Sequence, residues 1–383
     1  MRRTADAVVV GGGVMGASTA YHLARKGCRQ VLLLERNPLF GQEATGKCAG
    51  GIRYQFATEI NIRLSQASLP MLDRFEDELG QAIDLRRCGY LFVLTNERDV
   101  EAFRAIVALQ NRLGVGTQWL TGDEVRERLP LLRLDDALAG TWNAADGLAD
   151  PNGVVQGYIA GASRLGATCL TDVEVTGLRV EGGRVRAVQT RQGEVETPLV
   201  VNAAGPWAGE VGKMAGVDIP VVPLRRQIAV TTPIPQLPRD FPFVIDFARS
   251  LYFHREGAGL LTGMSNPHER PGFDQRVDAE WELVHFAAAL ERMPLLADAG
   301  IASRWAGLYE VSPDAHPILG RVPEVEGLYC IAGFSGHGFM HGPICGLLLA
   351  EEIVDGRAHS LDISSLGLSR FREGRPIREY NVV

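Results

Sequence analysis

The sequence predicts an α/β fold that begins with a buried strand, a glycine-rich turn and a helix. Three observations near the start of the 383-residue chain support this prediction. Residues 6–10 form a short β-branched run, the pattern G-x-G-x-x-G follows at 11–16, and residues 17–26 show helical spacing of apolar positions. This order of elements is typical of the Rossmann-like unit that binds dinucleotides.

Each glycine of this turn has its own predicted role. Gly11 permits the tight turn, Gly13 lets the backbone approach a pyrophosphate, and Gly16 lets the helix pack against the strand. The N-terminus of the helix would then present free N–H groups and a partial positive charge to the phosphates.

A second strand is predicted at residues 30–34, and it ends at Glu35, 19 residues after Gly16. A carboxylate at this distance can accept a hydrogen bond from a ribose hydroxyl. The alternative is a solvated strand end. The acid disfavours a ribose 2′-phosphate, although the adjacent Arg36 is the residue type that would accommodate one.

Composition excludes several classes of protein. The chain is 46% hydrophobic and 22% charged, as is ordinary for a globular protein, and no apolar run approaches the roughly 20 residues of a membrane span. The first apolar run is too short for a signal peptide, so a cytoplasmic protein is expected. The six cysteines form no CxxC pair, which argues against structural zinc and a disulfide framework. The net charge of −7 argues against a nucleic-acid surface.

Four later segments complete the expected elements. Residues 96–113 predict a charged helix, and residues 173–209 predict alternating strands, a buried strand and a turn of small residues. The segment 327–356 predicts a strand, a glycine-rich turn and a helix, and "RWAGLYEVSPDAHPILG" at 304–320 precedes it.

Several of these stretches resemble a known family. "WAGLYEVSPDAHPILGR", "AAGPWAG" and "GFSGHGFMHGP" are similar to motifs of the FAD-dependent amino-acid oxidase superfamily, which contains D-amino-acid oxidase, glycine oxidase and sarcosine oxidase. With "GYLFVLTNERDVEAF" and "GTWNAADGLADPNGV", they are most similar to the branch that holds the β subunits of L-proline dehydrogenases and heterotetrameric sarcosine oxidases. The resemblance spans nearly the whole chain.

The resemblance implies a Rossmann-like FAD-binding domain that is interleaved with a smaller α+β substrate domain carrying an antiparallel sheet. The segments implied for the FAD-binding domain are 1–85, 146–220 and 306–383, and those for the substrate domain are 86–145 and 221–305.

The implied cofactor is FAD, with its ADP half on the N-terminal motif. The residues implied to bind it are Gly11, Gly13, Val14, Met15, Gly16, Glu35, Arg36, Thr45, Gly46, Gly50, Gly51, Val175, Ala204, Gly205, Trp207, Gly307, Gly336, His337, Gly338, Phe339 and Met340. For Trp207, a plain core aromatic is the alternative. Gly336, Gly338 and the following helix would aim N–H groups at the flavin's pyrimidine edge, where reduction places negative charge.

The attachment is expected to be noncovalent. Relatives that tether a flavin use a Cys just before the "SPD"-like motif or a His after the first flavin loop. Here no Cys lies between Cys169 and Cys330, and no His lies between His22 and His254. His337 and His341 are four residues apart like a metal pair, but they have no nearby acidic ligand, so no metal is expected.

The family's reaction is transfer of a hydride from the α-carbon of an amino acid to flavin N5, which leaves an imine. Arg53 aligns with an arginine that binds the substrate carboxylate, and a salt bridge at a loop is the alternative. Met340 and Tyr309 stand where monomeric sarcosine oxidases have a Lys and glycine oxidases an Arg. Both departures argue against sarcosine and glycine as substrates.

Two further positions are implied by the proline-dehydrogenase-like branch. Arg226 replaces a His of that branch, and it is either a second carboxylate contact or a solvated strand residue. Tyr252 matches a Tyr, and it either caps the amine or packs against the sheet. Residues 262–270 lack the oxygen-activating Lys of sarcosine oxidases, which favours a dehydrogenase.

The leading prediction is therefore an FAD-dependent dehydrogenase or oxidase that acts on the Cα–N bond of an amino or imino acid of the sarcosine, proline or N-substituted type. The alternatives are a non-catalytic or electron-relay flavoprotein subunit of a larger amine dehydrogenase complex, and an NAD-binding dehydrogenase, against which the C-terminal motif argues. The small-molecule substrate is the expected partner. A homo-oligomer and a β subunit with an electron-accepting partner both stay open.

Overall fold

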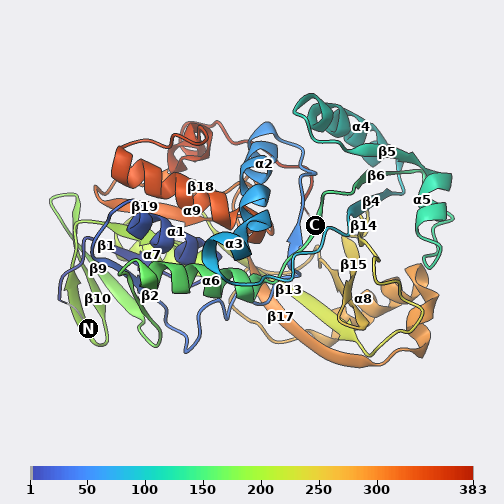
Figure 1. Cartoon of the computed structure of the whole chain (residues 1–383), viewed down its shortest axis with the longest axis horizontal. Coiled ribbons are helices and arrows are strands. Elements are labelled where there is room, and N and C mark those ends of the chain that lie inside the picture. Colours follow the sequence, from blue (N-terminus) through green and yellow to red (C-terminus); the bar gives the residue numbers. More distant parts are fainter. Residues whose placement is uncertain (1–2, 383) are drawn as a thin grey trace.

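The computed structural model describes residues 3–382 as two lobes, each built around its own large β-sheet (Figure 1). The chain crosses between the lobes several times. One lobe holds the N-terminal segment, a middle segment and the C-terminal helix α9, whereas the other holds α4, α5 and α8 (Figure 1).

The first lobe contains a six-stranded sheet with strand order β18-β19-β12-β1-β2-β8. All neighbours run parallel except β18 and β19. All four residues of β1 are buried, as a central parallel strand requires. The strands are β1 Ala7–Val10, β2 Val31–Leu34, β8 Thr168–Leu170, β12 Val200–Asn202, β18 Ile318–Arg321 and β19 Leu328–Ala332.

Side chains alternate between the two faces of this sheet. Val9 and Leu33 face a core shared with helices, whereas Val8 and Leu32 face a second core shared with a small three-stranded sheet and α7. The elements of these outer layers are α1 Val14–Arg25, α2 Glu59–Asp73, α3 Phe75–Leu79, α6 Pro151–Arg164, α7 Ala208–Met214, α9 Gly338–Asp355, β9 Val175–Glu181, β10 Arg184–Thr190 and β11 Gly193–Glu196.

Helices α1 and α9 pack closely because glycines face α1. A Cβ atom on Gly342 would lie 2.6 Å from a methyl group of Val14, and one on Gly346 would lie 2.2 Å from Ser18 Oγ. Gly338, one turn earlier on the same face, lies against Met15. The N-terminal ends of these two helices, from opposite ends of the sequence, therefore meet.

The second lobe contains an eight-stranded sheet with order β17-β13-β16-β15-β14-β4-β6-β5. It is antiparallel as predicted, except that β14 and β4 run parallel. These two strands come from distant segments, so no hairpin fixes their direction. The elements of this lobe are β4 Tyr90–Leu94, β5 Gln118–Thr121, β6 Ala139–Asn143, β13 Val222–Thr231, β14 Phe243–Asp246, β15 Leu251–Glu256, β16 Gly259–Met264, β17 Ile301–Val311, α4 Glu97–Arg112, α5 Gly122–Arg128 and α8 Ala279–Arg292.

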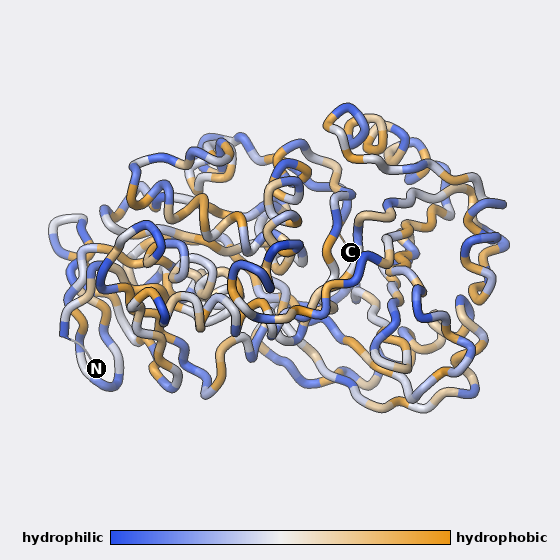
Figure 2. The backbone as a smooth tube through the Cα atoms, viewed as in Figure 1, coloured by the Kyte–Doolittle hydropathy of each residue, from blue (hydrophilic) through white to orange (hydrophobic). Residues whose placement is uncertain are grey.

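One face of this sheet packs against α5 and α8, and the other packs against α4. Apolar residues concentrate in the strands and helices inside each lobe, while the peripheral loops are hydrophilic (Figure 2). The remaining elements are β3 Gly51–Ile52 paired with β7 Gly147–Leu148, and four 3₁₀ turns at Gly205–Trp207, Pro294–Asp298, Ser364–Leu366 and Leu368–Phe371.

The elements agree closely with the sequence predictions. The helix predicted at 96–113 is confirmed as α4, and Asn96 caps its N-terminus by accepting the Asp99 N–H at 2.9 Å. The helix predicted at 17–26 begins three residues earlier, at Val14. The predicted boundary at 305/306 falls inside β17, which pairs with β13 up to Val311. The division into two domains stays a prediction.

Within residues 3–382, no helix is both long and apolar enough to cross a membrane. The cytoplasmic location stays a prediction.

Candidate functional site

The main cavity of the described chain runs between the two lobes, from the β1–α1 turn to the N-terminus of α9. Gly13 and Gly338 both line it, although 325 residues separate them in the sequence. The loop 41–51, the β12–α7 turn and one face of the eight-stranded sheet complete the walls. The two glycine-rich turns therefore open into one cavity.

The β1–α1 turn contains two glycines that the fold requires and one that it does not. Gly11 has φ +108°, and a Cβ atom on Gly16 would lie 1.8 Å from the Gly11 carbonyl oxygen. A Cβ atom on Gly13 would meet only Thr45 Oγ1, at 3.1 Å. Gly13 is the N-cap of α1 and has no side chain to cap the helix. The helix N-terminus thus faces the cavity with one N–H, that of Val14, bonded to Thr45 Oγ1 at 3.2 Å and without an N-cap side chain, which fits a phosphate ligand.

Glu35 lies at the end of β2 and lines the same part of the cavity. Its carboxylate accepts the Gly12 N–H at 2.7 Å and the Asn37 N–H at 2.8 Å. These bonds fix the carboxylate, and each oxygen keeps a lone pair for a ribose hydroxyl. Glu35 is therefore not a solvated strand end.

Trp207 is not a plain core aromatic. It lines the cavity, and the Arg36 guanidinium lies over its ring at 3.8 Å. The Phe273 ring stacks on it, with 5.4 Å between centroids and 14° between planes. Arg36, Trp207 and Phe273 thus form a stack at the wall of the cavity.

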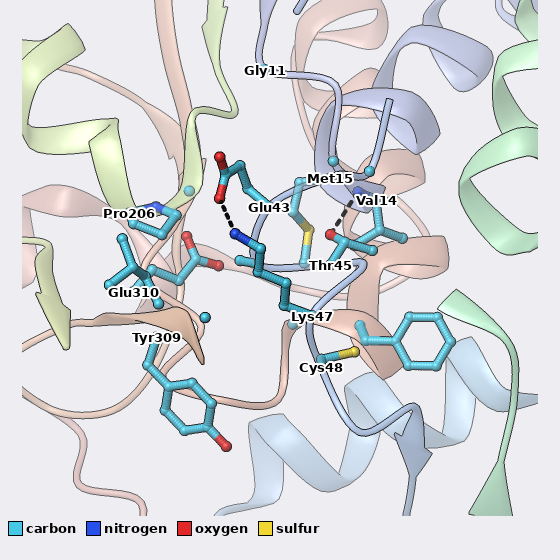
Figure 3. A pocket seen from close by; sticks show the side chains of 18 of the residues that line it. Gly11, Val14, Met15, Glu43, Thr45, Lys47, Cys48, Pro206, Tyr309 and Glu310 are labelled. Atoms are coloured by element: carbon cyan, nitrogen blue, oxygen red, sulfur yellow. Dashed lines mark hydrogen bonds and ion pairs between the residues drawn. The ribbon is translucent and has the colours of Figure 1, made fainter. Parts of the chain in front are cut away.

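The loop 41–51 brings a lysine into the cavity that the sequence analysis did not identify. Lys47 Nζ lies 2.9 Å from Glu43 Oε2 and 2.6 Å from Gln275 Oε1. Figure 3 shows this pair beside Thr45, whose Oγ1 accepts the Val14 N–H at 3.2 Å. The lysine expected at 262–270 in sarcosine oxidases is absent, but a lysine enters from another loop. No alignment of the 262–270 segment could have indicated it.

The turn before α9 places His337 at the helix N-cap, again without a side-chain cap. His337 Nε2 lies 3.0 Å from the Ala315 carbonyl oxygen, and its Nδ1 lies 3.3 Å from His341 Nδ1. His341 Nε2 in turn lies 2.9 Å from Ser65 Oγ. Burial lowers the pKa of His337 to about 4, so the ring is neutral at neutral pH. Both imidazoles are therefore engaged with protein groups.

Adjacent strands of the eight-stranded sheet bring Arg226, Tyr309 and Tyr252 into the cavity. Arg226 on β13 is paired with Gly307 on β17, so no side chain opposes it, and its guanidinium lies 5.1 Å from the centre of the Tyr309 ring. Burial raises the pKa of both tyrosines, which keeps their hydroxyls protonated. Arg226 is half-buried and lines the cavity, and its role toward a substrate stays a prediction.

Arg53 is buried in the cavity wall without an ion-pair partner among residues 3–382. It donates from Nη1 to the Gln55 carbonyl and from Nη2 to the Asn381 carbonyl, the latter at 2.6 Å, and its guanidinium lies over the Phe56 ring at 3.9 Å. Three of its five N–H donors have no acceptor within the described chain. The predicted alternative, a salt bridge at a loop, does not form among residues 3–382.

The segment around Asn381 is a second feature that the sequence analysis did not identify. Glu379 is buried and accepts the Ala57 N–H, the Thr58 hydroxyl and the Asn61 amide, at 2.7, 2.7 and 2.9 Å. These bonds hold the segment, so that the Asn381 carbonyl meets Arg53 and Val382 lines the cavity. Only long-range contacts create this arrangement, and no local pattern indicates it.

Glu310 lies next to Tyr309 on β17 but points to the other side of the strand (Figure 3). It lines the cavity, and its Oε2 accepts the Gly333 N–H at 3.1 Å. Burial raises the pKa of this carboxyl from 4.5 to about 7, while the bond from Gly333 acts in the opposite direction. The folded protein therefore favours the protonated form.

We expect Glu310 to make the apoprotein less stable as the pH rises. A raised pKa in the folded state contributes stability that is complete below pH 4.5 and is lost as the pH rises through about 7. The difference between the folded and unfolded pKa of Glu310 corresponds to up to about 3 kcal/mol of unfolding free energy. Urea unfolding of the wild type and Glu310→Gln at pH 5 to 8 measures it: the variant should gain in relative stability towards pH 8. Asp146, whose pKa burial also raises to about 7, contributes equally to both proteins. Parallel pH curves would contradict this assignment.

The structure brings nearly all predicted site residues together. All of them line the cavity except Gly16 and Gly46. Gly16 packs against Gly11, and a Cβ atom on Gly46 would lie 2.3 Å from the Gly41 carbonyl oxygen, so both shape the turns that carry the lining residues. The roles of individual residues toward a cofactor or substrate stay predictions.

A comparison with protein families supports a cofactor site in this cavity. The model of the family described as FAD dependent oxidoreductase matches residues 6–352, which span both glycine-rich turns. The chain belongs to this family. Its cofactor is therefore FAD, and the two uncapped helix ends, with Glu35 at the end of β2, provide a cradle that fits it.

Curated relatives include two mitochondrial dehydrogenases. Mitochondrial sarcosine dehydrogenase of Homo sapiens is 33% identical over 98% of this chain and 43% of its own length. Mitochondrial dimethylglycine dehydrogenase of Rattus norvegicus is 32% identical over 96% of this chain and 45% of its own length. The chain thus spans less than half the length of these relatives.

Among solved structures, L-proline dehydrogenase from P. horikoshii has a TM-score of 0.91 and 32% identity, covering 99% of this chain and all of that one. Iminodiacetate oxidase from Chelativorans sp. BNC1 has a TM-score of 0.80 and 25% identity, covering 94% of this chain and 98% of that one. The predicted fold class is confirmed: a parallel Rossmann-like sheet is combined with separate, largely antiparallel sheets.

Proposed function

We propose that the protein, with FAD bound, oxidises the Cα–N bond of an amino or imino acid. The observation that carries this proposal is Arg53, a buried cation without a carboxylate partner, in the cavity that the two glycine-rich turns share. The relatives, which are named for sarcosine, dimethylglycine, proline and iminodiacetate, support the same class of substrate.

The chain's own residues would hold the cofactor at three places. The N-terminus of α1 would face the pyrophosphate and Glu35 the ribose, while the N-terminus of α9, from Gly338, would face the opposite end. When bound, FAD supplies a two-electron acceptor. Among cavity residues, burial raises the pKa of the Cys48 thiol to about 11, which suppresses its nucleophilic thiolate and favours noncovalent attachment.

The substrate's carboxylate would pair with the free N–H groups of Arg53, as a planar guanidinium allows. Tyr252 and Tyr309 keep protonated hydroxyls, which can hydrogen-bond the amine without adding negative charge. Two arginines near the amine disfavour its ammonium form, and the uncharged amine has the lone pair that a forming C=N bond requires. The apolar side chains of Phe243 and Ile245, with the ring of Tyr90, exclude water from this wall.

Anaerobic mixing of the purified yellow protein with a panel of amino acids tests the proposal. We expect proline, an N-methyl amino acid or an opine to bleach the visible flavin band, because each offers a carboxylate and an amine on one carbon. Persistent colour with every compound would contradict the proposal and favour a flavoprotein subunit without substrate turnover. A colourless preparation whose spectrum responds to NAD would contradict FAD itself.

A further inference from the structure

Four cationic side chains line the cavity, and they differ in their contacts. Lys47 is paired with Glu43, and Arg36 lies over the Trp207 ring, directly after Glu35 at the predicted ribose end. Arg36, Arg53 and Arg226 form no ion pair within the part of the chain that the structure describes. Away from the predicted ribose end, Arg53 and Arg226 are therefore the two cations available to a substrate.

Arg226 contrasts with its neighbour on β13. The Arg225 guanidinium has Glu269 and Asp278 at 3.2 Å each and Asp274 at 3.8 Å. Arg226 points to the other face of the sheet, into the cavity, and donates one hydrogen bond, from Nη1 to the Arg225 carbonyl at 2.9 Å. Its Nε is buried and has no hydrogen-bond partner among residues 3–382. The side chain as a whole is half-buried. Because a buried N–H donor without an acceptor is costly, this guanidinium is expected to have an anionic ligand.

Arg53 and Arg226 line the same cavity, and the Arg226 guanidinium lies 5.1 Å from the centre of the Tyr309 ring. The charges of Arg226 and Arg53 both lower the pKa of the Tyr309 hydroxyl, although the larger effect of burial raises it. The carboxylates of Glu379 and Asp146 raise the pKa of Arg53 but lie beyond ion-pair distance from it. Both are hydrogen-bonded to other residues. A substrate with one carboxylate would neutralise only one of the two guanidinium groups.

We propose that the substrate is an amino or imino acid with a second carboxylate, which Arg226 binds while Arg53 binds the first. This inference rests on the proposed function. The reaction stays the same: the Cα–H bond breaks, a C=N bond forms, two electrons and two protons pass to bound FAD, and water then cleaves the imine to an amine and a carbonyl compound.

Iminodiacetate and sarcosine form the decisive pair, because both are N-substituted glycines with a secondary amine and only the first has a second carboxylate. In anaerobic stopped-flow mixing with the holoenzyme, we expect iminodiacetate to reduce the flavin with a second-order rate constant about 30- to 100-fold above that of sarcosine, as one charge-assisted contact provides. Arg226→Met should remove most of this ratio, and Arg226→Lys should keep part of it. Arg225→Met is the matched control, because Arg225 lies outside the cavity, and it should leave the ratio unchanged.

A second pair separates this inference from the proposed function. Thiodiacetate and methylthioacetate have no C–N bond, and their dissociation constants, from perturbation of the flavin spectrum, test binding alone. Thiodiacetate should bind at least about tenfold more tightly in the wild type but not in Arg226→Met. Tighter thiodiacetate binding without bleaching by either amine would support the second carboxylate and overturn the oxidation. Bleaching by both amines at equal rates, with equal binding of both thioethers, would overturn the inference and leave the oxidation intact.

Discussion

Replacing Arg53 with methionine is expected to lower kcat/KM for the amino-acid substrate by about 10²- to 10⁴-fold. The substrate carboxylate would enter a buried wall without its counter-charge, and removing one partner of a buried charge pair costs about 3–5 kcal/mol. Methionine keeps most of the apolar stem that lies against Phe56. Steady-state kinetics with the substrate found in the panel measures the loss.

Arg53→Lys is the control for charge. It should recover part of the lost activity, because lysine supplies a cation but not the planar fork that binds a carboxylate through two N–H groups. An unchanged flavin spectrum and thermal midpoint would show that the cavity is intact. A kcat/KM within threefold of the wild type in the methionine variant would contradict the assignment of Arg53 to the carboxylate.

Replacing Gly13 with alanine is expected to weaken FAD binding by about ten- to a hundredfold while the apoprotein stays folded. The new methyl group would stand at the uncapped N-terminus of α1, where the pyrophosphate approaches the backbone. Among the residues that the structure describes, it would meet only Thr45 Oγ1, at 3.1 Å, and a small rotation of that side chain relieves the contact. Titration of apoprotein with FAD, followed by flavin fluorescence, measures the loss.

Two other glycines provide control variants for this experiment. Gly16→Ala places a Cβ atom 1.8 Å from a backbone oxygen, so it should lower the stability of the apoprotein itself. Gly116→Ala meets nothing within 4 Å and is the neutral control. If Gly13→Ala binds FAD like the wild type, or unfolds like Gly16→Ala, the assignment of Gly13 to the cofactor is wrong.

The fold could be predicted largely because its signals are local. The buried valines of β1, the glycine turn and the spacing of α1 lie within 20 residues, and the cap of α4 lies within four. The pairing of β17 with β13, within which the predicted boundary at 305/306 falls, could not be predicted in this way, because a strand's partner is a long-range contact.

The sequence likewise predicted some features of the candidate site and left others undecided. Sequence motifs indicated Arg53, Arg226, Tyr252 and Tyr309, and the cavity contains all four. They left Arg226 open between a ligand contact and a solvated residue, because a lone arginine on a strand has no local signature of burial. Its missing ion pair became visible only with the neighbouring side chains in place.

The sequence by itself determined a dinucleotide turn at one end, a second glycine-rich turn at the other, and a family that uses FAD. Only the tertiary structure decided that α1 and α9 pack through glycines so that both turns open into one cavity, that Lys47 and Glu310 lie in it, and that Glu379 holds the segment which contacts Arg53. The physical reason is the distance along the sequence between the residues that interact. Turns and helices follow from neighbours along the chain, whereas burial, charge pairing and shifted pKa values follow from neighbours in space.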